Sequence, residues 1–209
     1  MNTAILMTVL AVVFTILVGT VDRQPVGVEG TKIGLASIKT AFFNRLGFNE
    51  TFYKLSTIFG ILSFALGGGF VVFFVIQLAK RKSLSKVDRN LIFLMGLYAA
   101  ALILYLIFDK LLILNYRPVL RDKGLEASYP STHALLAWAI LVSAVDQWNI
   151  YIEKEKLQLG LVIGSYALLA VVLVTRTLSG VHWLTDIIGG ILIADALVAW
   201  YRYFGAEKE

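Results

Sequence analysis

Six long apolar stretches run through the chain, and each is long enough to cross the hydrocarbon core of a bilayer. They lie near residues 3–21, 55–79, 91–109, 132–148, 158–175 and 183–203. A helix of about 20 apolar residues spans such a core. Because lipid cannot hydrogen-bond to the backbone, each stretch has to be helical. The sequence therefore predicts an all-α fold, a six-span transmembrane helical bundle.

The composition also favours lipid as the solvent. Of the 209 residues, 58% are hydrophobic and 16% are charged, whereas about a quarter of a soluble domain is charged. The chain has no cysteine, which excludes disulfides and thiolate metal sites. Its net charge of +5 fits basic residues at lipid headgroups, and no basic, aromatic-interleaved face suggests a nucleic-acid partner.

We expect one integral-membrane domain over residues 1–209. The first stretch lacks a basic leader and a small-residue cleavage site, so it is predicted to be a retained span and not a signal peptide. The connection 80–90, KRKSLSKVDRN, holds five basic residues and one acidic residue, which by the positive-inside rule predicts that it is cytoplasmic. Connections 22–54, 110–131 and 176–182 would then lie outside the cytoplasmic membrane.

The connection 22–54 contains TKIGLASIKTAFFNRLGF, in which apolar residues recur at roughly helical spacing. This pattern is typical of an amphipathic helix lying in the membrane interface. Two interpretations remain open at this point. The helix is either an anchor at the membrane surface or a lid beside a functional site.

Three polar clusters stand at the predicted outer ends of the spans. The first is KLLILNYRP, in which Lys110 and Arg117 are seven residues apart. Seven residues make about two helical turns, so both cations are predicted to share one helix face, with Pro118 ending the helix. Two basic residues at a membrane surface also have a purely structural explanation, because such side chains extend toward the headgroups.

The second cluster, YPSTHA, is predicted to begin the fourth span, with Pro130 in its first turn. Ser131, Thr132 and His133 would then lie at a helix N-terminus, where free N–H groups and the helix dipole attract anions. An ordinary helix start with an interfacial histidine would give the same pattern.

The third cluster is TRTLSGVHWLTD. Arg176 is predicted to end the fifth span, with Ser179-Gly180 as the turn and His182 at the start of the sixth. Asp186 lies four residues further on, so its carboxylate can face the imidazole and orient it. A structural His–Asp pair is the plain alternative. However, the chain has two histidines in all, and both lie in these clusters.

The three clusters together indicate phosphoryl chemistry. Three cations, a helix start, two histidines and one orienting carboxylate would meet on one side of the membrane. Positive charge of this kind matches the oxygens of a phosphoryl transition state. We expect no metal and no other cofactor, because the cations can supply the charge that magnesium supplies elsewhere, and the sequence has no carboxylate cluster to hold a metal.

The clusters resemble the signature of the type 2 phosphatidic acid phosphatase superfamily, KxxxxxxRP, then PSGH, then SRxxxxxHxxxD. The spacing within each motif and the order of the motifs match. Two positions depart from it: Thr132 stands for the family glycine and Thr175 for the serine. Threonine keeps the backbone N–H at the first and the hydroxyl at the second, although the Thr132 side chain would alter the shape of the pocket.

The resemblance implies a role for each residue of the signature. It implies that His182 attacks phosphorus and forms a phosphohistidine, and that Asp186 holds its ring. His133 would protonate the leaving oxygen and then activate water. The remaining residues would bind the phosphate oxygens: Lys110, Arg117, Ser131, Thr132 through its N–H, and Arg176.

The expected function is that of a membrane lipid phosphatase acting outside the cytoplasm. Undecaprenyl diphosphate, phosphatidylglycerol phosphate and phosphatidic acid are the candidate substrates. Two other classes stay open: a non-hydrolytic phosphotransferase or transporter that uses the same phosphate site, and a vanadium-dependent haloperoxidase. The haloperoxidases resemble this superfamily in their anion site but are largely soluble, which the six apolar stretches disfavour.

Overall fold

A computed structural model describes residues 1–120 and 124–205 of the chain. Residues 121–123, in the predicted connection 110–131, and residues 206–209 lie outside the described part. The described residues form helices and no strands. The helices are α1 (Asn2–Thr20), α2 (Ala36–Leu46), α3 (Glu50–Arg81), α4 (Arg89–Leu106), α5 (Thr132–Tyr151), α6 (Glu155–Leu178) and α7 (Leu184–Gly205), with short 3₁₀ turns at Val28–Gly30 and Leu84–Lys86 and a π-helical turn at Ile107–Leu111.

Six of these helices are long and apolar enough to cross a membrane, which confirms the predicted six-span bundle. They are α1, α3, the continuous stretch of α4 and its π-helical turn, α5, α6 and α7. The first connection contains a separate helix, α2, also as predicted. The protein is therefore a multi-pass, all-helical membrane protein.

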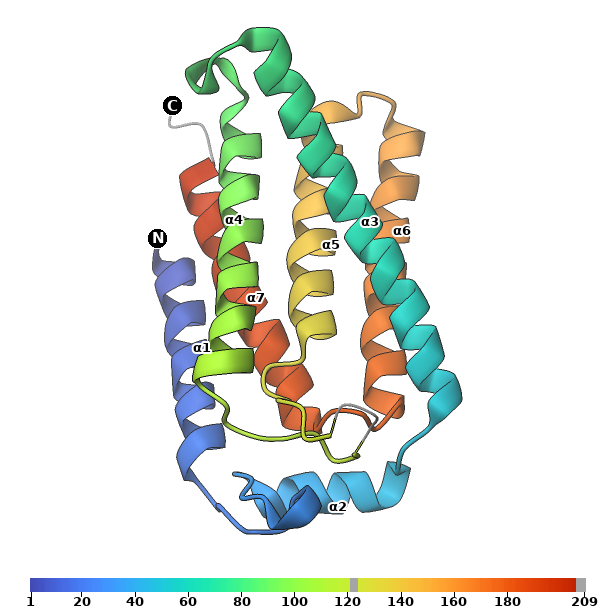
Figure 1. Cartoon of the computed structure of the whole chain (residues 1–209). Coiled ribbons are helices and arrows are strands. Elements are labelled where there is room, and N and C mark those ends of the chain that lie inside the picture. The colour runs from blue at the N-terminus through green and yellow to red at the C-terminus, as the bar shows by residue number, and fades with distance from the viewer. Residues whose placement is uncertain (121–123, 206–209) are drawn as a thin grey trace.

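The helix α5 is the centre of the bundle. It packs against α3, α4, α6 and α7, whereas α1 packs mainly against α7 (Figure 1). α5 and α7 are the most buried of the six spans, while α1 and α6 expose apolar side chains such as Ile5, Val9, Leu159 and Ile163. Exposed aliphatic side chains of this kind suit a lipid-facing surface.

The connections that contain the three polar clusters lie at one end of the bundle. α2 crosses this end, next to the connection before α5 and the turn between α6 and α7 (Figure 1). The basic connection between α3 and α4 lies at the opposite end (Figure 1). The alternation of the spans thus groups the polar clusters as the sequence predicts.

Helix α3 begins earlier than predicted. It starts at Glu50 instead of residue 55, because Asn49 caps it: the Asn49 side chain accepts a hydrogen bond from the Phe52 N–H at 3.1 Å. Asparagine is among the best N-cap residues, since its side-chain oxygen satisfies one of the free N–H groups of the first turn. The extra turn brings Tyr53 and Ser56 to the end of the bundle that holds the polar clusters.

The orientation of α2 differs from the simple amphipathic prediction. Lys39 faces the protein and is 1% exposed, whereas Ile38 faces outward and is 58% exposed. Ile33 and Ala36 pack with Trp183, and the Phe43 ring lies 5.6 Å from the Trp183 ring. Contacts with the turn before α7 thus determine which face of α2 is buried. That buried face includes one charged residue, Lys39.

Candidate active site

His182 lies in the turn between α6 and α7. The sequence predicted it at the start of the last span, expected near residue 183; in the structure α6 continues to Leu178 and α7 begins at Leu184, so His182 lies two residues before the helix. The turn is possible because Gly180 has φ +62° and because a Cβ there would lie 1.9 Å from the Gly47 carbonyl oxygen. Only glycine fits at that position. His182 itself is 5% exposed.

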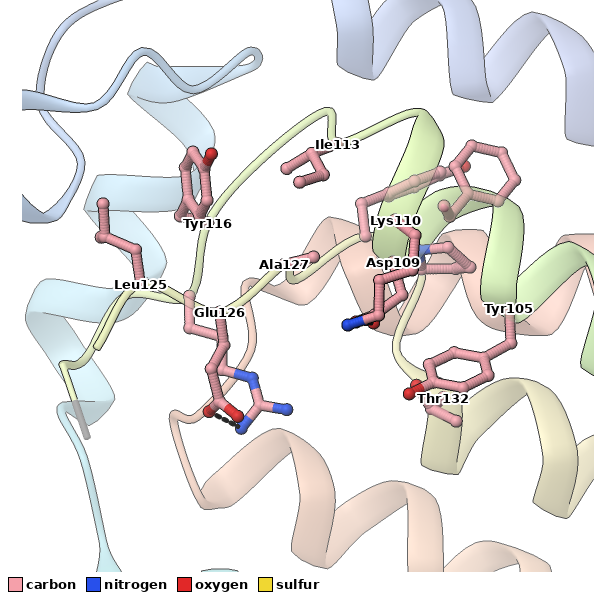
Figure 2. Close-up of a pocket in the computed structure, with 13 residues that line it drawn as sticks. Tyr105, Asp109, Lys110, Ile113, Tyr116, Leu125, Glu126, Ala127 and Thr132 are labelled. Atoms are coloured by element: carbon pink, nitrogen blue, oxygen red, sulfur yellow. Dashed lines mark ion pairs between the residues drawn. The ribbon is translucent and has the colours of Figure 1, made fainter. Parts of the chain in front are cut away.

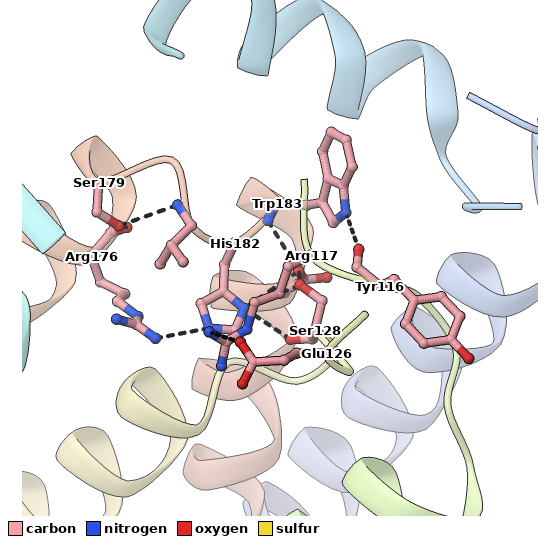
Figure 3. A network of polar contacts seen from close by, with 10 residues as sticks. Tyr116, Arg117, Glu126, Ser128, Arg176, Ser179, His182 and Trp183 are labelled. Carbon is pink, nitrogen blue, oxygen red and sulfur yellow. Dashed lines mark hydrogen bonds and ion pairs between the residues drawn. The ribbon is translucent and has the colours of Figure 1, made fainter. Parts of the chain in front are cut away.

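His182 and Asp186 meet through a third residue. The Nδ1 of His182 is 3.7 Å from the nearer Asp186 oxygen, which is too long for a hydrogen bond. Ser128 lies between them: its hydroxyl donates to Asp186 Oδ2 and lies 3.1 Å from the Nδ1 of His182. The backbone N–H of Trp183 donates to the same carboxylate oxygen at 3.0 Å (Figure 3). The carboxylate therefore orients the ring mainly through Ser128.

Ser128 was not predicted from the sequence. It is 1% exposed and directly precedes the second cluster. Its partners lie 54 and 58 residues further along the chain, so no local spacing indicates them. Its N–H donates to the Asn115 carbonyl at 2.9 Å, which fixes this segment against the first cluster.

The hydrogen bonds of His182 define the state of its ring. Nδ1 lies 3.0 Å from the Ser128 carbonyl, which can only accept, so we assign the proton to Nδ1. Nε2 then holds the lone pair and accepts from Arg176 Nη2 at 3.0 Å (Figure 3). Burial, together with the nearby Arg176, lowers the pKa of His182 to about 4. At neutral pH the ring is uncharged, and its free lone pair is on Nε2.

Arg176 lies in the last turns of α6 and is 2% exposed. Its guanidinium reaches the Ser56 hydroxyl at 3.4 Å and stacks over the Tyr53 ring at 5.7 Å. Both partners come from the first turns of α3, which exist because α3 begins at Glu50. The guanidinium is thereby held beside Nε2 of His182.

His133 lies in the first turn of α5 and is half-buried. Its ring packs 5.5 Å from the Phe64 ring. A Cβ at Gly60 would lie 2.5 Å from Cδ2 of His133, so α3 makes room for the imidazole with a glycine. Arg176, His182 and Arg117 are close enough to His133 to interact with it electrostatically. The second and third clusters therefore share one electrostatic environment.

The first cluster differs from its predicted geometry. Lys110 and Arg117 do not share a helix face, because the π-helical turn ends at Leu111 and the chain then runs as a loop. A bridge between Tyr116 and Ala127 holds this loop in an antiparallel pair. Pairing with Ala127, which lies eleven residues after Tyr116, thus overrides the helical spacing.

Lys110 and Arg117 instead line one pocket of about 570 Å³. Lys110 pairs with Asp109 at 2.7 Å, and Arg117 pairs with Glu126 at 2.9 Å. Figure 2 shows Asp109 and Lys110 on one wall of this pocket and Glu126 on another. The Lys110 side chain is 71% exposed, so it lies at the mouth of the pocket and is the outermost of the three cations.

Ser131 and Thr132 lie where the second cluster meets this pocket. Ser131 is the N-cap of α5, and Pro130 precedes it instead of lying in the first turn as predicted. The Ser131 hydroxyl is buried without a hydrogen-bond partner, as is Nε of Arg117. Thr132 lines the pocket. Buried donors without partners are uncommon in proteins, and donors beside a helix N-terminus suit an anion.

Two glycines of α7 fix the segment before α5. A Cβ at Gly189 would lie 2.2 Å from the Tyr129 ring, and a Cβ at Gly190 would lie 3.0 Å from the Ser131 carbonyl. The Ser131 N–H donates to the Asp186 backbone carbonyl at 2.9 Å. The second and third clusters are therefore in direct backbone contact.

Among the residues that the structure describes, no group of three or more His, Cys, Asp or Glu side chains is arranged to hold a metal ion. Asp186 is engaged by Ser128 and Trp183. Glu126 and Asp109 are each paired with a cation. Each of these carboxylates is therefore already engaged by a donor or a cation of the site.

The fold and the site define a six-span membrane protein with a histidine, serine and aspartate network beside a basic pocket. The chain belongs to the PAP2 superfamily, whose family model matches residues 91–209, a range that includes all three clusters.

A solved structure also resembles the whole chain. It is described as the crystal structure of a transmembrane PAP2-type phosphatidylglycerolphosphate phosphatase from Bacillus subtilis. The TM-score is 0.68 at 16% sequence identity, and the match covers 98% of this chain and 96% of the other. At this identity the likeness concerns the fold. No curated protein sequence matches the chain.

Proposed function

We propose that the protein is a lipid phosphate phosphatase that works through a phosphohistidine on His182. The observation that best supports this is the state of the His182 ring: Nε2 holds a lone pair beside the Arg176 guanidinium, and Nδ1 is fixed by Ser128. An uncharged, oriented imidazole next to a cation is an activated nucleophile for an anionic substrate. Membership of the PAP2 superfamily agrees with it.

The reaction proceeds in two displacements. Nε2 of His182 attacks phosphorus, and the bond from phosphorus to the leaving oxygen breaks while His133 donates a proton to that oxygen. His133 then removes a proton from water, which attacks the phosphohistidine and releases inorganic phosphate. Arg176 moves its hydrogen bond from Nε2 to a phosphate oxygen when the substrate binds. Asp186, through Ser128, stabilises the positive charge that develops on the ring.

The phosphate oxygens are bound by groups from all three clusters. These are the cations Lys110, Arg117 and Arg176, the Ser131 hydroxyl and the N–H of Thr132. A helix start adds its dipole to the same point. Such fixed donors stabilise the charge of a phosphoryl transition state without reorganising.

A lipid substrate is supported by an apolar groove beside the basic pocket. The groove has a volume of about 380 Å³ and lies between α1, the α4 stretch and α7. Phe108 lines both the groove and the basic pocket, and Tyr129 of the pocket hydrogen-bonds to Thr15 of the groove at 2.7 Å. A lipid whose phosphate lies in the pocket can thus place a tail in the groove. Undecaprenyl diphosphate, phosphatidylglycerol phosphate and phosphatidic acid all have this form.

The test of this function is phosphate release from those three lipids and from a short-tailed, soluble phosphate monoester, using purified protein in detergent. We expect release of inorganic phosphate from at least one long-tailed lipid. Transfer of the phosphoryl group to an acceptor without release would identify a phosphotransferase. Binding without turnover would identify a transporter, and halide oxidation with bound vanadate a haloperoxidase.

Filling the groove is expected to penalise long tails. Val12 lines the groove and is 51% exposed, so Val12→Trp places an indole where the tail would lie without disturbing the core. We expect kcat/KM for the long-tailed lipid to fall about tenfold, while the value for the short-tailed ester stays unchanged. Val13→Trp, at a 48% exposed neighbour that does not line the groove, is the matched control. Equal losses in both variants would contradict the tail assignment.

The site is proposed to face the outside of the cytoplasmic membrane, because the basic connection lies at the opposite end of the bundle. Cysteine introduced into this cysteine-free chain tests it. Ser85 and Leu125 are both exposed, one at each end. In intact cells an impermeant maleimide should label Leu125→Cys, and it should label Ser85→Cys only after permeabilisation. The reverse pattern would show that the orientation is inverted.

A further inference from the structure

Lys39 is a buried cation that lies outside the three clusters. It belongs to α2, is 1% exposed, and its Nζ has no hydrogen-bond partner. Burying an ammonium group costs several kcal/mol unless an opposite charge compensates for it. The opposite charge that acts on Lys39 is that of Asp186 in the first turn of α7, and Arg23 is the nearby like charge. Lys39 therefore lies in the field of the carboxylate that orients His182.

The helix that contains Lys39 is docked on the turn that contains His182. Lys39, Phe43, Gly180, His182 and Trp183 line one small void between them. The Asn49 N–H, just after α2, donates to the Ser179 carbonyl at 3.0 Å. The position of Lys39 is thus set by the same contacts that hold the turn of the nucleophile.

We propose that Lys39 is a positioning residue that keeps His182 uncharged by balancing the buried carboxylate of Asp186. This rests on the proposed function, in which His182 is the nucleophile. A buried carboxylate is stabilised by one nearby positive charge, because water does not solvate the ionised carboxylate there. With Lys39 in place that charge is the ammonium, and Nε2 of His182 keeps its lone pair. Without Lys39 the nearest group that can supply it is the imidazole, which loses its lone pair on protonation.

Charged or titratable side chains from each element packed around the turn face His182. They are Arg176 on α6, Arg117 on the loop of the first cluster, His133 on α5, Asp186 on α7 and Lys39 on α2. Arg176 lies at Nε2 of His182 and Arg117 lines the substrate pocket, so substrate phosphate competes for both of these cations. Lys39 lines the small void beside His182 and not the substrate pocket, so substrate phosphate does not compete for it.

The proton state of Lys39 fits this role. Burial lowers the pKa of Lys39 to about 8, and the Asp186 charge acts against this lowering. Lys39 is therefore still cationic at neutral pH and below. The pKa of His182 is lowered to about 4, and removal of a nearby positive charge raises it. The effect of losing Lys39 should thus grow as the pH falls from 8 toward 5.

The experiment compares Lys39→Met, Lys39→Arg and the wild type, with Lys32→Met as the matched control at an exposed lysine of the same segment. Methionine fills the space without the charge, and arginine keeps the charge. In Lys39→Met we expect kcat at pH 5 to fall about twofold with KM unchanged, because a rise of about one unit in the pKa of His182, from about 4, protonates about half of the rings at that pH. The loss should shrink at pH 8. Lys39→Arg should restore the wild-type profile, and Lys32→Met should retain it.

A second measurement does not depend on activity. The chain has two histidines, so ¹⁵N-histidine NMR of the whole protein in detergent follows both rings, and His133→Gln assigns them. We expect the titration midpoint of His182 to rise by about one pH unit in Lys39→Met and to stay in place in Lys39→Arg. A midpoint that does not move in Lys39→Met overturns the proposal, whatever that variant does to activity.

The two failures are distinguishable. If the wild type releases no phosphate from any lipid, the proposed function fails, while the NMR titration still tests the link between Lys39 and His182. If the wild type is active and Lys39→Met merely lowers the yield of folded protein without moving the midpoint, Lys39 is structural and the inference is wrong.

Discussion

Replacement of His182 by alanine is expected to abolish turnover, lowering kcat by about 10⁴-fold or more, as loss of a nucleophile does in other covalent catalysts. No neighbouring group can take its place: the Ser128 hydroxyl already donates to Asp186, and His133 packs against α3 at Gly60. The measurement is phosphate release by purified protein whose unfolding temperature matches that of the wild type.

The paired variant, His133→Ala, separates the two steps. Without the residue that activates water, the phosphohistidine on His182 should form and decay slowly. Substrate with a labelled phosphate should then leave acid-labile, alkali-stable label on the protein, and peptide mass spectrometry should place it at His182. His182→Ala should take up no label. Label on His133 in the wild type would reverse the assignment of nucleophile and acid.

The number and course of the spans could be predicted because lipid allows few alternatives. A stretch of about 20 apolar residues has to be helical in a bilayer, so hydropathy alone indicates α1, α3 and the other spans. Helix ends are less constrained, since local caps decide them. Asn49 adds a turn to α3, and α6 continues past Arg176 to Leu178, while α7 begins at Leu184, so His182 lies in the turn between α6 and α7.

The polar clusters could be predicted as a set but not in their geometry. Spacing of seven residues implied a common helix face for Lys110 and Arg117, yet the loop between them pairs with residues near Ala127 instead. Spacing of four implied direct contact of His182 and Asp186, yet Ser128 lies between them. Both errors have one cause, because contacts with distant segments leave no local pattern.

For the interfacial helix, the sequence predicted the element but not which of its faces is buried. Its composition indicated an amphipathic helix, and α2 is such a helix, but the pattern does not say which face is covered. The covered face includes Lys39, which lines a small void together with Trp183 and His182 and interacts electrostatically with Asp186. Of the two interpretations that the sequence left open, the docking of α2 on the His182 turn favours a lid beside the site over a plain surface anchor.

Arg176 is expected to be the most important of the three phosphate-binding cations. Lys110 is largely exposed and pairs with Asp109, and Arg117 pairs with Glu126. Arg176 is 2% exposed and touches Nε2 of His182 directly. A buried cation acts in a low dielectric, where its interaction with developing charge is strongest. Arg176→Ala should therefore lower kcat on the order of a hundredfold to a thousandfold.

Arg176→Lys should recover little of this loss. A guanidinium binds two oxygens through a planar fork, whereas an ammonium is a point charge. In addition, the ring of Tyr53 and the Ser56 hydroxyl hold the guanidinium in place from α3. Lys110→Ala is the informative comparison, because it removes one positive charge from the exposed mouth of the same site. Equal losses for Arg176→Ala and Lys110→Ala would show that total charge matters more than the position of the cation.

The same cations lead to the expectation that catalysis needs no divalent metal and is blocked by vanadate. In the proposed mechanism, Arg176, Arg117 and Lys110 place positive charge where the transferring phosphoryl group gathers negative charge, which is the work that a metal ion performs in other phosphatases. Vanadate can adopt the five-coordinate geometry of the transition state, and in the proposed mechanism Nε2 of His182 would be its apical ligand. Wild-type turnover should therefore be the same with and without excess chelator, and vanadate should inhibit it in competition with the lipid. Complete loss of activity in chelator, restored by magnesium, would mean that a metal ion and not the cation cluster stabilises the transition state.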